Sequence, residues 1–249
     1  MSGHSKWSTI KHKKGAADAK RAKIFTKFIK EITVAARLGG PDVSSNPRLR
    51  LAVDTAKGQS MQKDSIERAI KKGAGLDDTS QYEEATYEGY APGGVALLVD
   101  CLTDNKVRIV AEIRNIFAKK NGHIGESGSV AWMFEKKGQI LVAASAISED
   151  ELMLKALDAG AEDVTLQEDN WAIITSFESF LTVKDILEKA GLAILEAQVV
   201  MLPKTQVPVT DPETVKSIMN LIDALEDNDD VQNVWANFDI DEALLESLG

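Results

Sequence analysis

The chain is poor in the residues on which many metal, redox and structural sites depend. It has one cysteine and three histidines among 249 residues. Cys101 cannot form an internal disulfide, and inside the apolar run VALLVDCL it is expected to be a small core residue in a reducing cytoplasm. No two histidines have the spacing of a helical zinc site. The sequence therefore predicts no metal site and no cofactor.

Long apolar runs are also absent. No stretch approaches the roughly 18 residues that a membrane-spanning helix needs. The N-terminus MSGHSKWSTIKHKKG has charge but lacks the apolar core of a secretory signal. Hydrophobic residues make up 44% of the chain, which is enough for ordinary cores. We expect a globular, cytoplasmic protein that does not associate with membranes.

Recognisable catalytic patterns are missing. No GxSxG nucleophile elbow occurs. The glycines of segment 122–128 are spaced three apart, unlike those of dinucleotide or phosphate-binding loops, so a flexible turn is expected there. The acidic run EDNDD at 226–230 lacks the glycine and closing glutamate of a calcium loop, and a solvated helix end is expected instead. We expect that the protein is not an enzyme.

The chain does show a strong segregation of charge. Residues 1–75 hold 17 of the 29 Lys+Arg and 6 of the 39 Asp+Glu, a net charge of +11. Residues 76–249 hold the remaining 12 bases and 33 acids, a net charge of −21. This asymmetry is typical of a polyanion-binding module attached to an acidic body, with a solvated lysine-rich helix as the alternative.

Three helices are predicted in the basic block, over 16–38, about 47–57 and about 61–72. They are expected to form a small bundle, preceded by a basic arm of about fifteen residues that orders on a partner. On the first helix the lysines step by three, four and three, so they share one stripe away from the apolar face. The predicted nucleic-acid contacts are Lys6, Trp7, Lys11, His12, Lys13, Lys14, Lys20, Arg21, Lys23, Lys27 and Lys30.

A second anion contact is suggested by the segment TDNKVR, which follows a predicted strand and opens a helix with unpaired N–H groups. The candidates are Asn105, Arg108 and Arg114, and these two arginines are the only ones after residue 75. Local salt bridging within the acidic body is the alternative. The sequence leaves both readings open.

After residue 78 predicted strands alternate with helices. Residues 136–204 follow the order βαββαβ of a ferredoxin-like sandwich. Residues 79–135 follow the order ββαβ, with the last strand at 129–135, and lack an αβ pair that the segment after Pro208 supplies. We predict an α+β protein with three domains: a basic arm and three-helix bundle (1–78), a discontinuous ferredoxin-like α+β domain (79–135 plus 205–249) and an inserted ferredoxin-like domain (136–204).

Four segments carry a resemblance to a known family: MSGHSKWSTIKHKKGAADAKRAKIFTKFIKEI, NPRLRLAVDTAKGQSMQKDSIERAIKKGAG, YEGYAPGGVALLVDCLTDNKVRIVAEIRNIF and IGESGSVAWMF. They resemble signatures of the YebC family over essentially the whole chain. One departure is Ile109, where a small hydroxyl residue is expected. The resemblance implies a helical N-terminal domain, two α+β domains and a non-enzymatic, cytoplasmic regulator of transcription that binds DNA. Mitochondrial relatives are translational activators, and bacterial relatives are also connected with ribosomes.

The expected partner is nucleic acid, and the sequence leaves its kind open. No predicted helix presents Asn, Gln or Arg for reading base edges. The basic residues are mostly lysines, which contact phosphate as point charges, and this favours RNA or the ribosome over specific DNA sites. A monomer or weak dimer is expected, and a dimer could place two bundles on DNA. A third interpretation is a protein–protein adaptor whose basic arm only maintains solubility.

Overall fold

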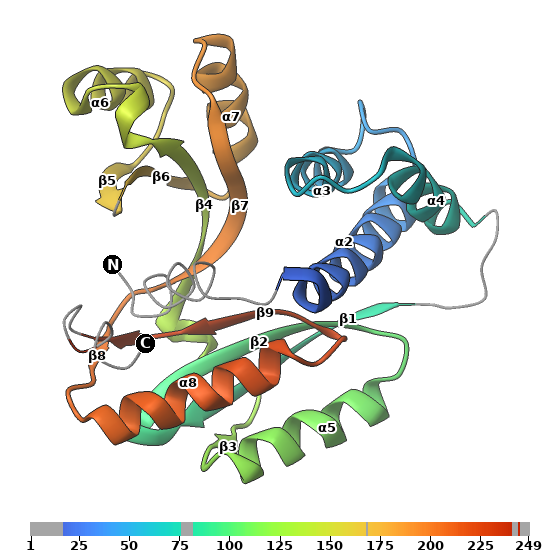
Figure 1. The fold of residues 1–249 in the computed structure, drawn as a ribbon, viewed down its shortest axis with the longest axis vertical. Coiled ribbons are helices and arrows are strands. Elements are labelled where there is room, and N and C mark those ends of the chain that lie inside the picture. The colour runs from blue at the N-terminus through green and yellow to red at the C-terminus, as the bar shows by residue number, and fades with distance from the viewer. Residues whose placement is uncertain (1–16, 76–81, 168, 241–243, 245–249) are drawn as a thin grey trace.

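The structure is a computed structural model that describes residues 17–75, 82–167, 169–240 and 244. Figure 1 shows three parts: a helical bundle, a sheet with two helices beneath it, and a second sheet with its own helices. This confirms the α+β class and the order of N-terminal helices followed by two sheet units.

The bundle consists of α2 (Ala17–Gly39), α3 (Pro47–Gly58) and α4 (Lys63–Gly73). Asn46 joins the first two helices: its side-chain oxygen accepts from the Leu49 amide at 3.0 Å, and its side-chain amide donates to the Ala35 carbonyl at 2.8 Å. The proline at the first position of α3 suits an N-terminus whose N–H groups are otherwise unpaired. The capped start of α3 therefore also fixes the end of α2.

A close crossing of α2 and α4 sets the direction of α2. Gly73 lies against the Thr33 carbonyl, and a Cβ built on Gly73 would stand 2.8 Å from the Ala36 Cβ. The Thr33 hydroxyl donates to the Ala69 carbonyl at 3.3 Å across the same contact. Only glycine allows this approach of the two backbones.

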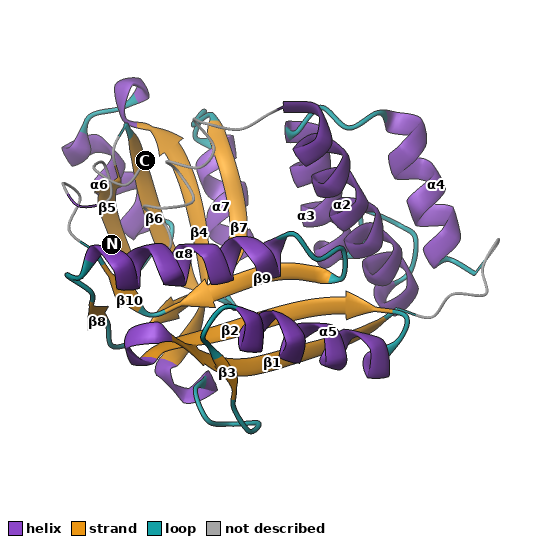
Figure 2. Ribbon diagram, turned by 60° about the horizontal axis from the view of Figure 1, so that its bottom comes forward, coloured by secondary structure: helices purple, strands orange, loops and turns teal. Residues whose placement is uncertain are grey.

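The first sheet contains β1 (Glu83–Ala91), β2 (Val95–Thr103), β3 (His123–Ile124) and β9 (Val231–Ala236) in the antiparallel order β3-β1-β2-β9. The 3₁₀ turn η1 (Pro92–Gly94) joins β1 to β2. Helices α5 (Lys106–Lys119) and α8 (Pro212–Glu226) cover one face (Figure 2). The core between them includes Leu97, Val99, Ile113, Phe117 and Ile222.

The second sheet contains β4 (Phe134–Ala143), β5 (Asp163–Gln167), β6 (Asn170–Ser176) and β7 (Ile194–Pro203) in the order β5-β6-β4-β7. The 3₁₀ turn η3 (Ala144–Ala146), α6 (Glu149–Asp158) and α7 (Phe180–Lys189) complete this unit. Its strand order and antiparallel pairing are those expected of a ferredoxin-like split βαβ arrangement.

The two sheets share one spatial plan with different chain orders. If β2, β3, β1 and β9 are matched to β4, β5, β6 and β7, the orders β3-β1-β2-β9 and β5-β6-β4-β7 coincide. In the first sheet the strand equivalent to β6 comes first in the chain. The strands β8 (Val207–Pro208) and β10 (Phe238–Asp239) form a separate, short parallel pair. The first sheet is therefore a permuted ferredoxin-like arrangement, and its last αβ pair, α8 and β9, follows the second sheet in sequence.

One predicted strand is wrong. The range 129–135 was expected to form the last strand of the first α+β block, but it contains the 3₁₀ turn η2 (Ala131–Met133) and only the start of β4. The fourth position of the first sheet is filled by the two-residue strand β3 instead. The amides of Val130 and Ala131 bind a side chain, as described below, and are not available to a strand ladder.

We propose that residues 136–204 form an inserted domain. Each α+β unit has its own large core, and a smaller cluster of Ala96, Leu98, Val130 and Phe134, with Met201 and Trp235 against it, lies where the two units meet. Excision of 136–204 with a short Gly/Ser joint is expected to leave a folded remainder, and the excised segment is expected to melt cooperatively with a margin of only a few kcal/mol. Amide NMR dispersion and thermal melts of both pieces test this. Collapsed spectra for both would mean that the units share one core.

Substitution of Gly73 tests the helix crossing that orients α2. Gly73→Ala is expected to lower the free energy of unfolding by about 2 kcal/mol, because the new methyl group overpacks the contact with Thr33 and Ala36. Gly58→Ala is the matched control, since a Cβ there meets no atom within 4 Å. It should be neutral or slightly stabilising in a urea titration. Equal effects of the two substitutions would contradict the close packing.

Candidate nucleic-acid interface

Three lysines predicted to contact nucleic acid face the chain's own acidic loop. We call Lys23, Lys27 and Lys30 the α2 lysine face, and residues 226–230, between α8 and β9, the acidic loop. Lys23 Nζ lies 2.9 Å from Asp227 Oδ1, and Lys27 Nζ donates to the Glu226 carbonyl at 3.1 Å. The solvated helix end expected at 226–230 is therefore a contact surface for α2.

Lys30 is the innermost residue of this face. Its Nζ donates to the Asp229 carbonyl and to Asp230 Oδ1, both at 2.6 Å. The side chains of Lys30 and Asp230 are each 9% exposed, whereas those of Lys23 and Asp227 are 44% and 75% exposed. The contact between the bundle and the acidic body is thus buried at Lys30 and open to water at Lys23.

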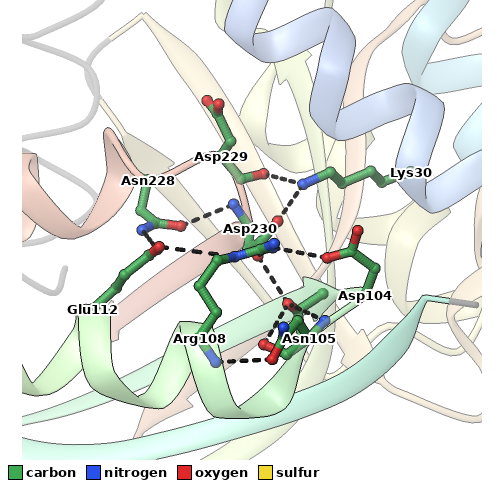
Figure 3. Close-up of polar contacts among 9 residues, drawn as sticks. Lys30, Asp104, Asn105, Arg108, Glu112, Asn228, Asp229 and Asp230 are labelled. Carbon is green, nitrogen blue, oxygen red and sulfur yellow. Dashed lines mark hydrogen bonds and ion pairs between the residues drawn. The ribbon is translucent and has the colours of Figure 1, made fainter. Parts of the chain in front are cut away.

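Asp230 also binds groups of the first α+β unit. Figure 3 shows Lys30 approaching it from α2 and Arg108 from α5. Arg108 donates to Asp230 Oδ2 at 2.6 Å, and the Thr103 hydroxyl at the end of β2 donates to the same oxygen at 2.8 Å. One carboxylate therefore joins the bundle, the start of α5 and the acidic loop.

The three donors control the protonation of Asp230. Burial alone would raise the pKa of this carboxyl, but the hydrogen bonds from Lys30, Arg108 and Thr103 outweigh it and hold the pKa below the ordinary aspartate value. The carboxylate is therefore ionised at neutral pH. Since its folded-state pKa is depressed, its stabilising contribution is present above the unfolded pKa and is lost as pH falls through the folded one.

The predicted second anion contact is occupied by local interactions. Asn105 caps α5, and its side-chain oxygen accepts from the Arg108 amide at 2.9 Å. Arg108 is paired with Asp104 at 2.8 Å as well as with Asp230. Arg114 is exposed on α5. Of the two readings left open by the sequence, this geometry favours local salt bridging for Arg108.

The remaining predicted contacts lie at the edge of what the structure describes. Lys6, Trp7, Lys11, His12, Lys13 and Lys14 fall outside the described residues. The backbone of Lys20 and Arg21 lies in α2, but their side chains are not described. The described geometry therefore brings together only the α2 lysine face.

Exposed basic residues that the sequence reasoning missed lie on α3 and α4. We call the exposed side chains Lys57, Lys63, Arg68 and Lys71 the α3–α4 basic residues. Lys57 occupies the last turn of α3 and Lys71 the last turn of α4, where cations favour the helix dipole. The signal was present in the sequence: these helices add to the basic excess of residues 1–75 beyond the arm and α2.

A buried carboxylate shapes the loop after β3. Glu88, 7% exposed, accepts from the Val130 and Ala131 amides at 2.7 Å and from the Gly128 amide at 2.5 Å. Burial would raise the pKa of Glu88, but the three backbone donors hold it below the ordinary value. The segment 122–128, expected to be a turn, therefore contains the short strand β3 and ends in a tethered loop. This loop presents Trp132 with 63% of its surface exposed.

Cys101 is unsuited to redox or nucleophilic chemistry. It is 3% exposed, and burial together with Asp100 and Asp230 raises the pKa of its thiol to about 12. Within the described ranges, no three His, Cys, Asp or Glu residues are grouped so that they could hold a metal ion. None of the described helices is long and apolar enough to cross a membrane.

The fold and its charges define an α+β protein in which a basic helical bundle docks on an acidic body of two sheet units. Residues 5–76 match the family model described as the TACO1/YebC protein N-terminal domain, and residues 82–238 match the TACO1/YebC second and third domain. The chain belongs to the TACO1/YebC family, which confirms the resemblance seen in the sequence.

The chain is similar over its full length to proteins named as transcriptional regulators. A "probable transcriptional regulatory protein" of Desulfotalea psychrophila is 58% identical over 248 residues, covering 100% of this chain and 99% of the relative. One of the same name from Geobacter sulfurreducens is 54% identical and fully covered. The crystal structure of a conserved hypothetical protein from Aquifex aeolicus is 50% identical, with a TM-score of 0.86 over 94% of this chain and 96% of that one.

Replacement of Glu88 tests the loop tether. Glu88→Gln is expected to cost about 2 kcal/mol of unfolding free energy at neutral pH, because its amide group cannot accept from all three backbone donors. Since the pKa of Glu88 is depressed, the deficit relative to wild type should shrink as pH falls below about 4. Glu126→Gln, an exposed substitution with the same charge change, is the control. A deficit of the same size for both variants in thermal melts would refute the tether.

Proposed function

We propose that the protein is a non-enzymatic, cytoplasmic regulator of gene expression that binds nucleic acid through its basic N-terminal region. The observation that carries this proposal is the net charge of +11 in residues 1–75 against −21 in the rest of the chain. Relatives over 50% identical bear the name of transcriptional regulators, which supports a role in gene expression.

Binding is expected to depend on phosphate contacts. The predicted residues of the arm and the first turns of α2, including Lys14, Lys20 and Arg21, supply one part of the surface. The α3–α4 basic residues supply the other, because their side chains are exposed and lie in the same bundle. The acidic body would be repelled by a polyanion, so contact is restricted to the bundle and arm.

DNA is the partner that the relatives' names favour, and RNA or the ribosome is the second candidate. The second is favoured by the chemistry of the surface: three of the four α3–α4 basic residues are lysines, which contact phosphate without reading base edges. Nuclease-sensitive association, followed by sequencing of crosslinked RNA and DNA, distinguishes the two. Association that survives nuclease would instead support a protein adaptor.

Charge reversal tests the proposed surface. Lys57→Glu with Lys71→Glu is expected to weaken binding to single-stranded RNA and to duplex DNA about tenfold or more. The slope of log K against log salt should become shallower by about two. Both side chains are exposed, so the fold should be retained.

The matched control is Lys119→Glu with Lys189→Glu, two exposed substitutions on α5 and α7 with the same change in net charge. Equal loss in both double variants would show that only total charge matters. No binding by the wild-type chain to either nucleic acid would refute the proposed function.

A further inference from the structure

Each lysine amine of the α2 lysine face contacts an oxygen atom of the acidic loop. Lys23, Lys27 and Lys30 are spaced four and three residues apart, so they lie along one side of the helix. Each amine is met by oxygens of a single short segment at the C-terminus of α8. Two aspartate carboxylates and three main-chain carbonyls take part. Carbonyls at a helix C-terminus carry partial negative charge, so the loop presents a row of negative oxygens, as a nucleic-acid backbone does.

The burial of these contacts is graded. The pair of Lys23 and Asp227 is exposed to water, and such pairs contribute little to stability. The pair of Lys30 and Asp230 is buried and would be costly to separate if it left an unpaired charge. Opening is therefore expected to begin at Lys23.

Asp230 keeps partners when Lys30 leaves. Arg108 and the Thr103 hydroxyl remain on its second carboxylate oxygen. Lys30 in turn lies 5.7 Å from the centre of the Tyr82 ring, a second favourable neighbour for its charge. Separation therefore leaves neither Lys30 nor Asp230 as a charge without a favourable neighbour, and a reversible contact requires this.

We propose that the acidic loop is an internal competitor of nucleic acid for the α2 lysine face. In the free protein the loop occupies this face, and a bound phosphate backbone displaces it, starting from Lys23. The proposal rests on the proposed function and adds its regulation: apparent affinity is reduced by the fraction of molecules in which the face is closed.

Neutralisation of single carboxylates tests the competition. Asp227→Asn should tighten binding of a labelled single-stranded RNA and of a labelled duplex DNA about two- to fivefold, because the exposed ion pair with Lys23 is lost. Asp229→Asn is the matched control: it makes the same charge change two residues away, and this residue contributes its main-chain carbonyl to the contact. Equal tightening by both variants would mean a general charge effect and would overturn the proposal.

Crosslinking with a carbodiimide measures closure directly. This reagent joins an amine to a carboxylate in contact, and Lys23 Nζ lies 2.9 Å from Asp227 Oδ1. The yield of this crosslink, measured by mass spectrometry, should fall several-fold when the protein is saturated with the RNA or DNA probe. The pair of Lys155 and Glu151, 2.8 Å apart within α6, is the internal control and should not change.

The outcomes separate this proposal from the proposed function. Tight binding with an unchanged crosslink yield would overturn the competition and leave the nucleic-acid function standing. Absence of binding by the wild-type chain and by Asp227→Asn would overturn both. A fall in the Lys23–Asp227 crosslink alone, together with tighter binding by Asp227→Asn than by Asp229→Asn, is the expected result.

Discussion

The arrangement of the molecule depends on one buried carboxylate. The Asp230 side chain is 9% exposed and accepts hydrogen bonds from Lys30 of the bundle, Arg108 of α5 and the Thr103 hydroxyl at the end of β2. A buried charge is tolerated only when it is paired and hydrogen-bonded. The side chains that meet here come from segments far apart in sequence, so the position of the bundle over the first sheet is tied to the satisfaction of this group.

A second set of contacts holds the bundle against both sheet units. Arg48 of α3 pairs with Glu84 at the start of β1 at 2.6 Å. Lys184 of α7 lies 3.7 Å from Asp54 of α3, and Leu51 of the same helix packs against the core of the second unit. These pairs are more exposed than the pair of Lys30 and Asp230, so each is expected to add less to stability.

The sequence predicted the local elements well and the contacts between distant ones poorly. Periodicity, the Asn46-Pro47 cap and the terminal glycines located the bundle helices to within one or two residues. The βαββαβ order of the predicted elements correctly predicted the ferredoxin-like arrangement of the second sheet. The strand expected at 129–135 is not formed because Glu88, 42 residues before Val130, binds the amides of Val130 and Ala131. Periodicity carries no information on such a distant partner. The lysine stripe was placed on the correct helix, yet the group that covers it lies about 200 residues away in sequence.

The segregation of charge along the chain also determines which basic residues a polyanion can reach. At physiological salt, charges separated by more than about 8 Å are largely screened, so the +11 and −21 halves attract chiefly through the pairs in direct contact. Those pairs lie on one face of α2 and at Arg48 and Asp54 of α3, while the α3–α4 basic residues stay exposed on the same bundle. A polyanion that first meets the exposed residues would then have to exchange with carboxylates that the chain itself supplies. The acidic body is in this sense part of the binding equilibrium, because it sets which of the basic residues are available and at what salt concentration.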